Sequence, residues 1–327
     1  MVKKVSIIIP IFNSVSNLRN LILDLEKQTY PNVEVIFVDD QSTDDTFRVL
    51  ENLTKDVPQF LVKSIKHGGQ SAARNYGIDL STGDYVIFID SDDRVHSNYV
   101  ERLVSTLELE DADIVECRYV LGHKSKDYLK LKTSKIAGEL LENNVLDLLY
   151  STLISNVNSA PVWNKIYRKK LLDDERFLEG NSQSEDLWFN IKVFSKANRI
   201  VRISDELYFY FQNPASTLHK RVAHKDMEIL RTHELIVSFI KKIYGDSREL
   251  ELSKVKLART FYSLILRCLR NKTQSDFSKQ DFQVLKKGVM TNFKMLLSSP
   301  MKWNRKVILV ILVFMLKLNI INFKSIG

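Results

Sequence analysis

The chain has 327 residues, 44% of them hydrophobic and 27% charged, a balance that is typical of a folded globular protein and argues against a disordered one. Two cysteines, Cys117 and Cys268, are too few for a disulfide framework, and the N-terminal apolar run is too short for a signal peptide, so we expect a cytoplasmic protein. The net charge is +8, and residues 283–327 hold eight Lys and Arg but no Asp or Glu. This local basic tail favours an anionic membrane surface over nucleic acid.

The N-terminal third of the chain alternates between strand and helix patterns. The strand patterns are Val5–Ile9, Val33–Val38, Phe60–Ile65 and Tyr85–Ile89, and the helical ones are Leu18–Gln28, Thr43–Leu53 and Ser71–Leu80. Strands that are apolar on both faces and alternate with helices predict an α/β fold whose mostly parallel sheet is covered on both sides. In such a sheet, ligands bind beyond the carboxyl ends of the strands.

Carboxylates gather at two of these strand ends. Asp39 and Asp40 end the second strand, and Asp90, Asp92 and Asp93 follow the fourth. Carboxylates on one rim repel one another unless a cation or donor groups offset their charge. Because hard oxygen ligands suit Mn²⁺ and Mg²⁺, the pattern predicts a divalent metal held together with a diphosphate ligand.

The C-terminal part of the chain has helical periodicity. Long amphipathic runs occupy Met227–Tyr244 and Leu250–Arg270, and Val307–Leu316 is continuously apolar between Lys306 and Lys317. A membrane-spanning helix needs about 20 apolar residues. We therefore expect this last segment to lie in a membrane interface, with a buried core helix as the alternative.

Five segments resemble, in order, the motifs of family 2 glycosyltransferases with the GT-A fold. They read VSIIIPIFN, VEVIFVDDQSTDDT, GGQSAARNYGI, GDYVIFIDSDD and SEDLWF. The resemblance is dense over Val5–Asp93, resumes over Trp163–Phe189 and fades after about His219. It implies a Rossmann-like, mostly parallel sheet with helices on both faces. It also implies a nucleotide-sugar-binding half (1–115), an acceptor-binding half of the same domain (116–220) and a helical C-terminal region (221–327).

The resemblance assigns residues to the nucleotide. Asp40 matches the carboxylate that accepts the imide N–H of uracil, although guanine carries a similar proton and GDP stays open. Asp39 is a second donor contact or a turn residue. Pro10 and Phe12 resemble walls of the base pocket, with Phe12 alternatively a core residue.

The resemblance also assigns the diphosphate and the metal. Asp90, Ser91 and Asp92 match the Asp-any-Asp motif, in which the last carboxylate ligates Mn²⁺ or Mg²⁺ and the first approaches the ribose or a metal-bound water. Asp93 points to the sugar and acceptor or caps the next helix. Arg74 matches a diphosphate contact near a helix N-terminus, its alternative being a surface helix arginine.

The catalytic base is expected on a later helix. Asp186 matches the carboxylate that takes the acceptor proton, and Glu185 orients the acceptor. Trp163 and Lys165 resemble the acceptor-binding segment, with Trp163 alternatively in the core. His219 lies in the region where relatives often carry an arginine. It would contact the donor phosphates or the metal, and the alternative is that it contacts neither.

These assignments imply an inverting glycosyltransferase. It would move a hexose or N-acetylhexosamine from a UDP-sugar to a saccharide acceptor, such as a capsule, surface polysaccharide or lipid-linked oligosaccharide. The protein would act as a peripheral enzyme on the inner face of the cell membrane, and the C-terminal helices could form a homodimer. The alternatives are a polyprenyl-phosphate sugar synthase and a non-catalytic nucleotide- or glycan-binding partner of another transferase.

Overall fold

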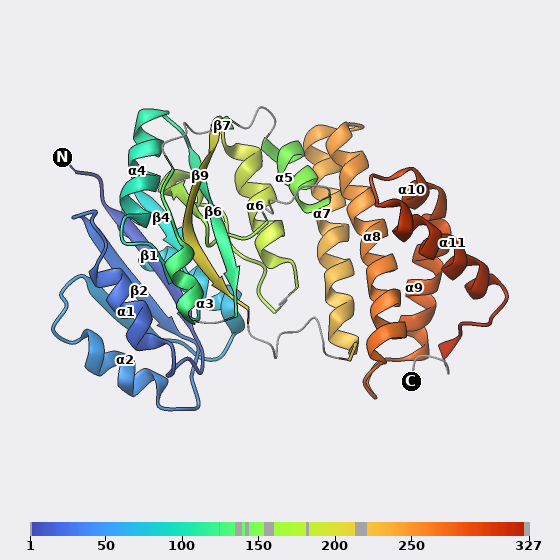
Figure 1. Cartoon of the computed structure of the whole chain (residues 1–327), viewed down its shortest axis with the longest axis horizontal. Helices are drawn as coiled ribbons and strands as arrows, with labels where there is room; N and C mark the ends of the chain where they lie inside the picture. The colour runs from blue at the N-terminus through green and yellow to red at the C-terminus, as the bar shows by residue number, and fades with distance from the viewer. Residues whose placement is uncertain are drawn as a thin grey trace. The chain divides into compact units, whose positions relative to one another are not determined.

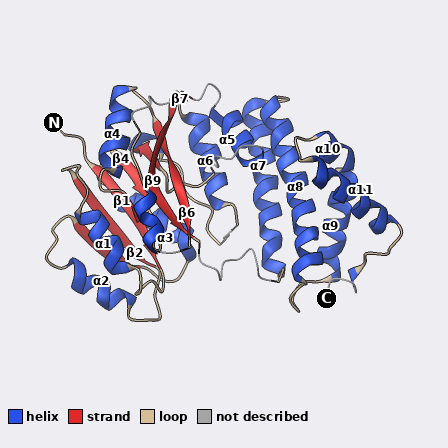
Figure 2. Ribbon diagram, in the orientation of Figure 1, coloured by secondary structure: helices blue, strands red, loops and turns tan. Residues whose placement is uncertain are grey.

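The computed structural model of the chain describes residues 2–123, 125–134, 139–140, 144–153, 160–180, 183–212 and 221–323 (Figure 1). The chain divides into two compact units. Unit 1 comprises Met1–Asn144 and Ser159–Pro214, and unit 2 comprises Val145–Asn158 and Ala215–Gly327. All the strands of the described residues belong to unit 1, and unit 2 is helical (Figure 2).

Unit 1 is built on one mixed sheet. Its described strands are β1 (Val5–Ile11), β2 (Val33–Asp39), β3 (Phe60–Ser64), β4 (Tyr85–Phe88), β5 (Arg94–Val95), β6 (Ile114–Gly122), β7 (Glu139–Leu140), β8 (Lys165–Arg168) and β9 (Ile200–Phe211). They follow the order β3-β2-β1-β4-β8-β6-β9-β5, with β7 paired to β9. The first four strands are parallel, whereas β8 runs antiparallel to β4 and β6. The four strands predicted from sequence are confirmed.

Helices cover both faces of this sheet. They are α1 (Leu18–Glu26), α2 (Thr46–Thr54), α3 (Gly69–Leu80), α4 (Tyr99–Leu109) and α6 (Glu185–Lys196), with short 3-10 turns η1 (Ser125–Lys130) and η2 (Lys169–Leu171). Along β2, Val35 and Phe37 join the core with α1, α2 and α4, whereas Ile36 and Val38 pack against Ala73 of α3. The continuous apolar strand pattern is thereby explained, because both faces are buried.

Helix α3 lies very close to β1. A Cβ at Gly77 would stand 2.3 Å from Cγ2 of Ile8, so only glycine allows this approach. The helix begins at Gly69, whose φ of 84° lies in the left-handed region. The glycine turn and the close packing bring the start of α3 to the carboxyl edge of β1, β2 and β4.

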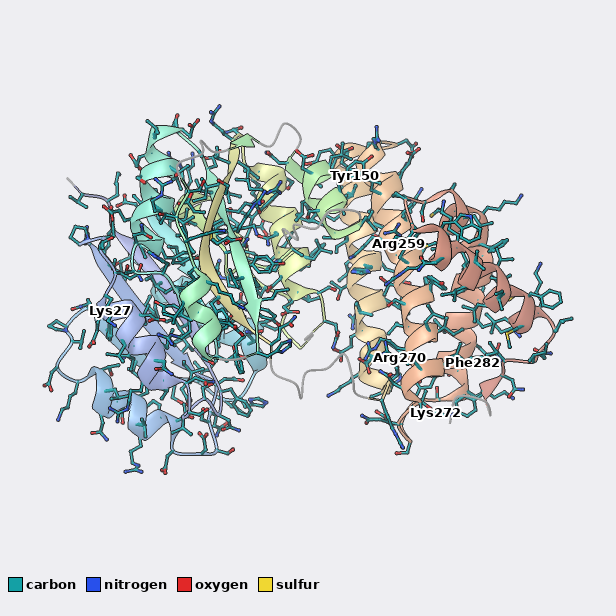
Figure 3. The ribbon with its side chains drawn as sticks, viewed as in Figure 1. Lys27, Tyr150, Arg259, Arg270, Lys272 and Phe282 are labelled. Atoms are coloured by element: carbon teal, nitrogen blue, oxygen red, sulfur yellow. The ribbon has the colours of Figure 1, made fainter. Side chains whose placement is uncertain are left out.

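Unit 2 is a helical bundle with its own apolar core. Its described helices are α5 (Asn144–Leu153), whose first residue belongs to unit 1, η4 (His224–Met227), α7 (Glu228–Tyr244), α8 (Arg248–Asn271), α9 (Lys279–Thr291), α10 (Phe293–Ser298) and α11 (Trp303–Lys317). Phe282, labelled in Figure 3, is buried in that core. Arg259 of α8 donates from Nη1 to the Leu153 carbonyl at 2.7 Å and so satisfies the C-terminal end of α5 (Figure 3). Among the described helices, none is both long and apolar enough to cross a membrane.

Candidate active site

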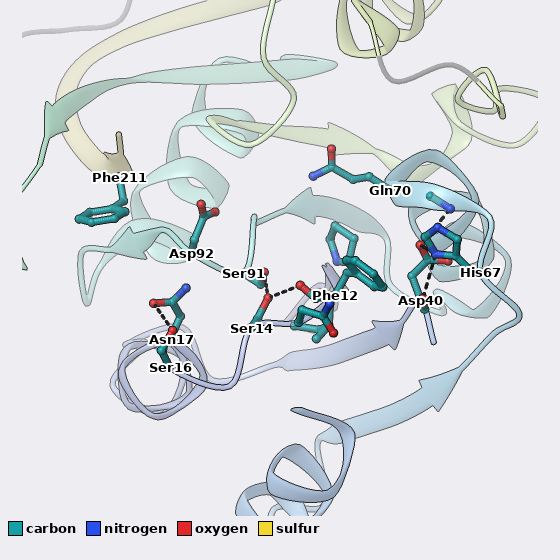
Figure 4. A pocket seen from close by; sticks show the side chains of 14 residues that line it. Phe12, Ser14, Ser16, Asn17, Asp40, His67, Gln70, Ser91, Asp92 and Phe211 are labelled. Carbon is teal, nitrogen blue, oxygen red and sulfur yellow. Dashed lines mark hydrogen bonds and ion pairs between the residues drawn. The ribbon is translucent and has the colours of Figure 1, made fainter. Parts of the chain in front are cut away.

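A pocket of about 500 Å³ opens at the carboxyl edge of β1, β2 and β4 (Figure 4). Ligands bind at this edge in parallel α/β sheets, and the volume suits a small molecule. The pocket is lined by Pro10, Ile11, Phe12, Asn13, Ser14, Ser16, Asn17, Asp40, His67, Gly69, Gln70, Ser91, Asp92 and Phe211. The structure thus brings together five residues that the sequence assigned to donor or metal, namely Pro10, Phe12, Asp40, Ser91 and Asp92.

Asp40 forms one end of the pocket. Its Oδ1 accepts from the Gly68 N–H at 2.7 Å and its Oδ2 from the Gly69 N–H at 2.9 Å. Nδ1 of His67 lies 2.8 Å from Oδ2, and the His67 ring packs against Phe12 with 5.1 Å between centroids (Figure 4). These contacts fix the carboxylate, whose side chain lines the pocket although it is only 4% exposed.

Asp39, the neighbouring carboxylate, is not among the pocket-lining residues. It is buried, and its Oδ2 accepts from the Ser42 N–H at 3.1 Å and from Ser64 Oγ at 3.3 Å. These bonds are those of a turn residue, the alternative that the sequence left open.

Asp92 and Ser91 contribute to another part of the pocket wall, and Asp92 lies towards Phe211 (Figure 4). Ser91 Oγ is 2.8 Å from Ser14 Oγ, which ties the loop after β4 to the loop after β1. Asp92 is exposed towards the pocket, yet the surrounding protein removes enough water to raise its pKa to about 6, and the charge of Asp90 adds to the rise. A cation or a donor from a ligand would offset this unfavourable charge.

Asp90 faces protein groups. Its Oδ1 accepts from Arg74 Nη2 at 2.8 Å and from Gln70 Nε2 at 3.1 Å. Gln70 itself lines the pocket, so it connects Asp90 with whatever binds there.

Arg74 is buried rather than displayed to the pocket. Its side chain is 1% exposed, and Nη1 donates to Asp186 Oδ1 at 2.7 Å, with Glu185 Oε1 at 3.8 Å. Burial alone would lower the pKa of Arg74, but the charges of Asp186, Asp90 and Glu185 raise it above its ordinary value. The guanidinium is therefore committed to carboxylates, and the surface-arginine alternative is wrong.

Asp186 and Glu185 begin α6, where the helix dipole favours acids. Asp186 Oδ2 also accepts from the Val162 N–H at 3.3 Å. Burial raises the pKa of Asp186, and the charge of Arg74 opposes that rise. Burial and the charge of Asp186 raise the pKa of Glu185 to about 7.

Asp93 is 1% exposed and points into the protein. Its Oδ2 accepts from the Tyr208 hydroxyl at 2.6 Å and its Oδ1 from the Phe211 N–H at 2.8 Å. The same hydroxyl accepts from the Asp90 N–H at 3.1 Å. Asp93 and Tyr208 thus fasten the acidic loop to β9, and Asp93 presents no free oxygen edge to an acceptor.

Trp163 and Lys165 are also internal. Trp163 is 5% exposed and stacks on Tyr208 and Tyr210, with centroids 4.3 Å and 5.3 Å away. Lys165 is fully buried; its Nζ donates to the Pro161 carbonyl at 2.6 Å and lies 3.3 Å from Glu116. Neither side chain offers an open surface to a sugar, so we assign both a structural role in packing near the site. His219 lies outside the described residues.

Residues of this region that sequence reasoning did not assign to the site include His67, Gln70, Tyr208 and Phe211. His67 and Gln70 flank the glycine turn that follows the third strand, so their position at a strand end was the available signal. Tyr208 and Phe211 belong to β9, and no local pattern links that strand to the acidic loop.

Asp92 is the candidate ligand for a divalent metal in the pocket. In the described part of the chain, no group of three or more His, Cys, Asp or Glu side chains is placed to hold a metal ion. A single hard carboxylate suffices where phosphate oxygens and water complete the coordination shell. Because Asp90 and Asp93 are occupied by protein donors, Asp92 is the carboxylate of this loop that is available.

The architecture of unit 1, a mostly parallel sheet with a pocket at its carboxyl edge, is shared with solved structures. The structure is similar to the Staphylococcus aureus TarS fragment 1–349 in complex with UDP-GlcNAc, with a TM-score of 0.64 and 23% identity over 88% of this chain and 81% of that chain. That comparison establishes the GT-A fold predicted from the sequence. The model of the family described as "Glycosyl transferase family 2" matches residues 6–175. The chain belongs to this family and is a glycosyltransferase.

Two relatives illustrate the range of the family. The cholesterol galactosyltransferase of Borreliella burgdorferi is 29% identical over 254 residues, 74% of this chain and 71% of that protein. The uncharacterized glycosyltransferase EpsJ of Bacillus subtilis is 31% identical over 223 residues, 66% of this chain and 63% of that protein. One of these relatives is named for its sugar and acceptor and the other is uncharacterized, so the substrate of this chain must be argued from its site.

Proposed function

We propose that the protein transfers a hexose or N-acetylhexosamine from a UDP-sugar to a saccharide acceptor with inversion at the anomeric carbon. One observation carries the proposal: Asp40 and Asp92 line different parts of the wall of the same pocket. A base with a ring N–H would donate to the Asp40 carboxylate while resting near Phe12 and His67. The similar TarS fold binds UDP-GlcNAc, which supports a UDP-linked donor.

The metal would be held by Asp92 and the diphosphate. When bound, Mn²⁺ or Mg²⁺ would supply positive charge that stabilises the departing UDP. Ser91, bonded to Ser14, would keep the loop that carries Asp92 in place.

Asp186 would act as the general base. The acceptor hydroxyl gives its proton to a carboxylate oxygen of Asp186 while its own oxygen bonds to the anomeric carbon. The bond from that carbon to the diphosphate oxygen breaks, and its electron pair leaves with UDP. Glu185, the next acid, would orient the acceptor.

Arg74 would serve as a positioning residue and not as a diphosphate contact. Its guanidinium spans Asp90 and Asp186 and is 1% exposed, whereas the Asp186 side chain is 20% exposed; neither residue is among those that line the pocket. By holding Asp186 Oδ1 and opposing the effect of burial on the Asp186 pKa, it would keep the base oriented and ionised.

The acceptor would be a capsule, surface-polysaccharide or lipid-linked saccharide, met by a peripheral enzyme on the inner face of the cell membrane. The basic, apolar tail supports this part of the proposal, as does the similarity to the TarS of Staphylococcus aureus, which is named as a poly(ribitol-phosphate) β-N-acetylglucosaminyltransferase.

The test is UDP release from a panel of UDP-sugars with Mn²⁺, with and without a chelator. Chelator-sensitive release from one sugar, lost in Asp92→Asn, is the expected result. Asp186→Asn should bind UDP by calorimetry as the wild type does but transfer no sugar. Undiminished turnover in either variant would contradict the role of that residue, and absence of both UDP binding and release would reject the UDP-linked donor.

A further inference from the structure

Helix α11 has two apolar faces. Leu309, Leu312, Val313 and Leu316 are buried in the core of unit 2. The other face is apolar as well, but it is open: Trp303 is 79% exposed, Ile311 53% and Phe314 60%. Helical periodicity places these three side chains on one stripe, where a surface helix of a globular protein normally carries polar residues.

The exposure is concentrated on this segment. Of the eighteen large apolar side chains exposed in the described residues, seven lie between Trp303 and Ile320. Scattered exposed leucines are ordinary on protein surfaces, but a contiguous apolar group marks an interaction surface.

Cations surround the stripe. Lys302, Arg305 and Lys306 lie at the start of α11, and Lys317 lies at its end. The sequence from residue 283 onward has no Asp or Glu that could pair with them locally. A lysine stem can lie along apolar surface while its ammonium reaches a polar layer.

We propose that the exposed face of α11 docks on an anionic lipid bilayer. The helix would lie in the interface, with Trp303, Ile311 and Phe314 at the acyl boundary and Lys306 and Lys317 at the lipid phosphates. Its 15 residues are too few to span the bilayer. A second copy fits less well, because a two-fold contact would bring the same cations together without an acidic partner.

The docking face of α11 rests on the peripheral membrane location proposed under the function, and it names the surface that would contact the lipid. It does not depend on the chemistry of the pocket. The test is co-sedimentation of the full chain with vesicles of phosphatidylglycerol and phosphatidylcholine in equal parts, compared with phosphatidylcholine alone. We expect binding to the anionic vesicles that weakens with salt.

The double variant Ile311→Ser, Phe314→Ser should weaken binding at least about tenfold through lost apolar burial. Lys306→Gln and Lys317→Gln should each weaken it about fivefold. Leu109→Ser, which changes a side chain 84% exposed on α4 of unit 1, is the matched control and should bind as the wild type does.

Thermal unfolding of the same variants distinguishes loss of vesicle binding from misfolding. UDP calorimetry distinguishes it from failure of the proposed function, because none of these positions lines the pocket. Undiminished vesicle binding by the double serine variant would overturn the proposal. The proposal would also be overturned if the wild type bound no vesicles but formed a concentration-dependent dimer that the double serine variant did not form. The exposed face of α11 would then bind a second copy of the chain.

Discussion

Arg74 on α3, which is buried, and Asp186 at the start of α6, which is 20% exposed, form an ion pair with 2.7 Å between Nη1 and Oδ1. The two residues are 112 positions apart in the chain. Through its other terminal nitrogen, Arg74 also holds Asp90 at 2.8 Å. One guanidinium therefore links the acidic loop after β4 to the proposed base.

Replacing Arg74 should separate catalysis from donor binding. In Arg74→Met the base loses the group that orients it, so kcat should fall about 100-fold, the scale of general-base catalysis, while UDP affinity changes little. The pH below which activity falls should also move upward, because Asp186 loses the cation that opposes the effect of burial on its pKa. Groups that face Asp186, namely Glu185, Asp90, Lys165 and Tyr167, contribute to the same profile.

Two further variants keep this prediction interpretable. Arg74→Lys should partly restore kcat and the pH profile, and Arg102→Met, which breaks the ion pair with Asp205, controls for loss of a structural pair. A large loss of UDP affinity in Arg74→Met, with an unchanged pH profile in a folded protein, would instead support a diphosphate contact.

Asp40→Asn should weaken UDP binding about 10- to 100-fold, the range for losing a hydrogen bond to a charged group. The amide replaces one acceptor oxygen by a donor, which would then face the N–H groups of Gly68 and Gly69. Isothermal calorimetry with UDP measures the change. Asp39→Asn is the matched control, since Asp39 is the adjacent carboxylate but does not line the pocket. Equal losses in both variants would mean that the effect comes from the fold of the turn and not from a base contact.

Tyr208→Phe should loosen the acidic loop. The change removes the hydroxyl that donates to Asp93 and accepts from the Asp90 N–H, so a buried carboxylate loses a partner. We expect a loss of about 1–3 kcal/mol in the free energy of unfolding and weaker Mn²⁺ dependence of turnover. Denaturant unfolding and metal titration measure the two effects. Tyr119→Phe, in the same aromatic cluster, should change stability less.

His233 should make unit 2 sensitive to acid. The residue is 2% exposed, its Nδ1 lies 2.7 Å from Thr260 Oγ1, and burial together with the charge of Lys256 lowers its pKa to about 3. Because the folded-state pKa lies below the unfolded value of 6.5, this contribution to stability is complete above pH 6.5 and is lost as the pH falls towards 3. The free energy of unfolding falls by about 1.4 kcal/mol for each pH unit below pH 6.5, which amounts to about 2 kcal/mol at pH 5.

The measurement is urea unfolding between pH 7 and pH 5. His233→Gln carries no titrating group, so the difference in stability between wild type and variant should shrink as the pH falls. Parallel pH profiles for the two proteins would contradict the buried, neutral histidine.

Much of unit 1 was predictable from local sequence. Strand and helix periodicity in Val5–Ile89 placed the four parallel strands, because a buried strand and an amphipathic helix each have a characteristic spacing of apolar residues. The ends of those strands located the pocket residues Asp40 and Asp92, since parallel strands present their carboxyl ends at one edge.

The partners of the polar side chains were decided by the tertiary structure. Arg74, Asp93 and Trp163 stand in motifs that predict contact with ligands, yet long-range packing buries them against Asp186, Tyr208 and Tyr210. The residue type determines which bonds a side chain can form. The tertiary structure, which places β9 beside β5 and α6 near α3, determines which partner lies within bonding distance. The same reason applies to α11: its sequence shows an apolar helix with basic ends, and only packing on the unit 2 core shows which face stays open.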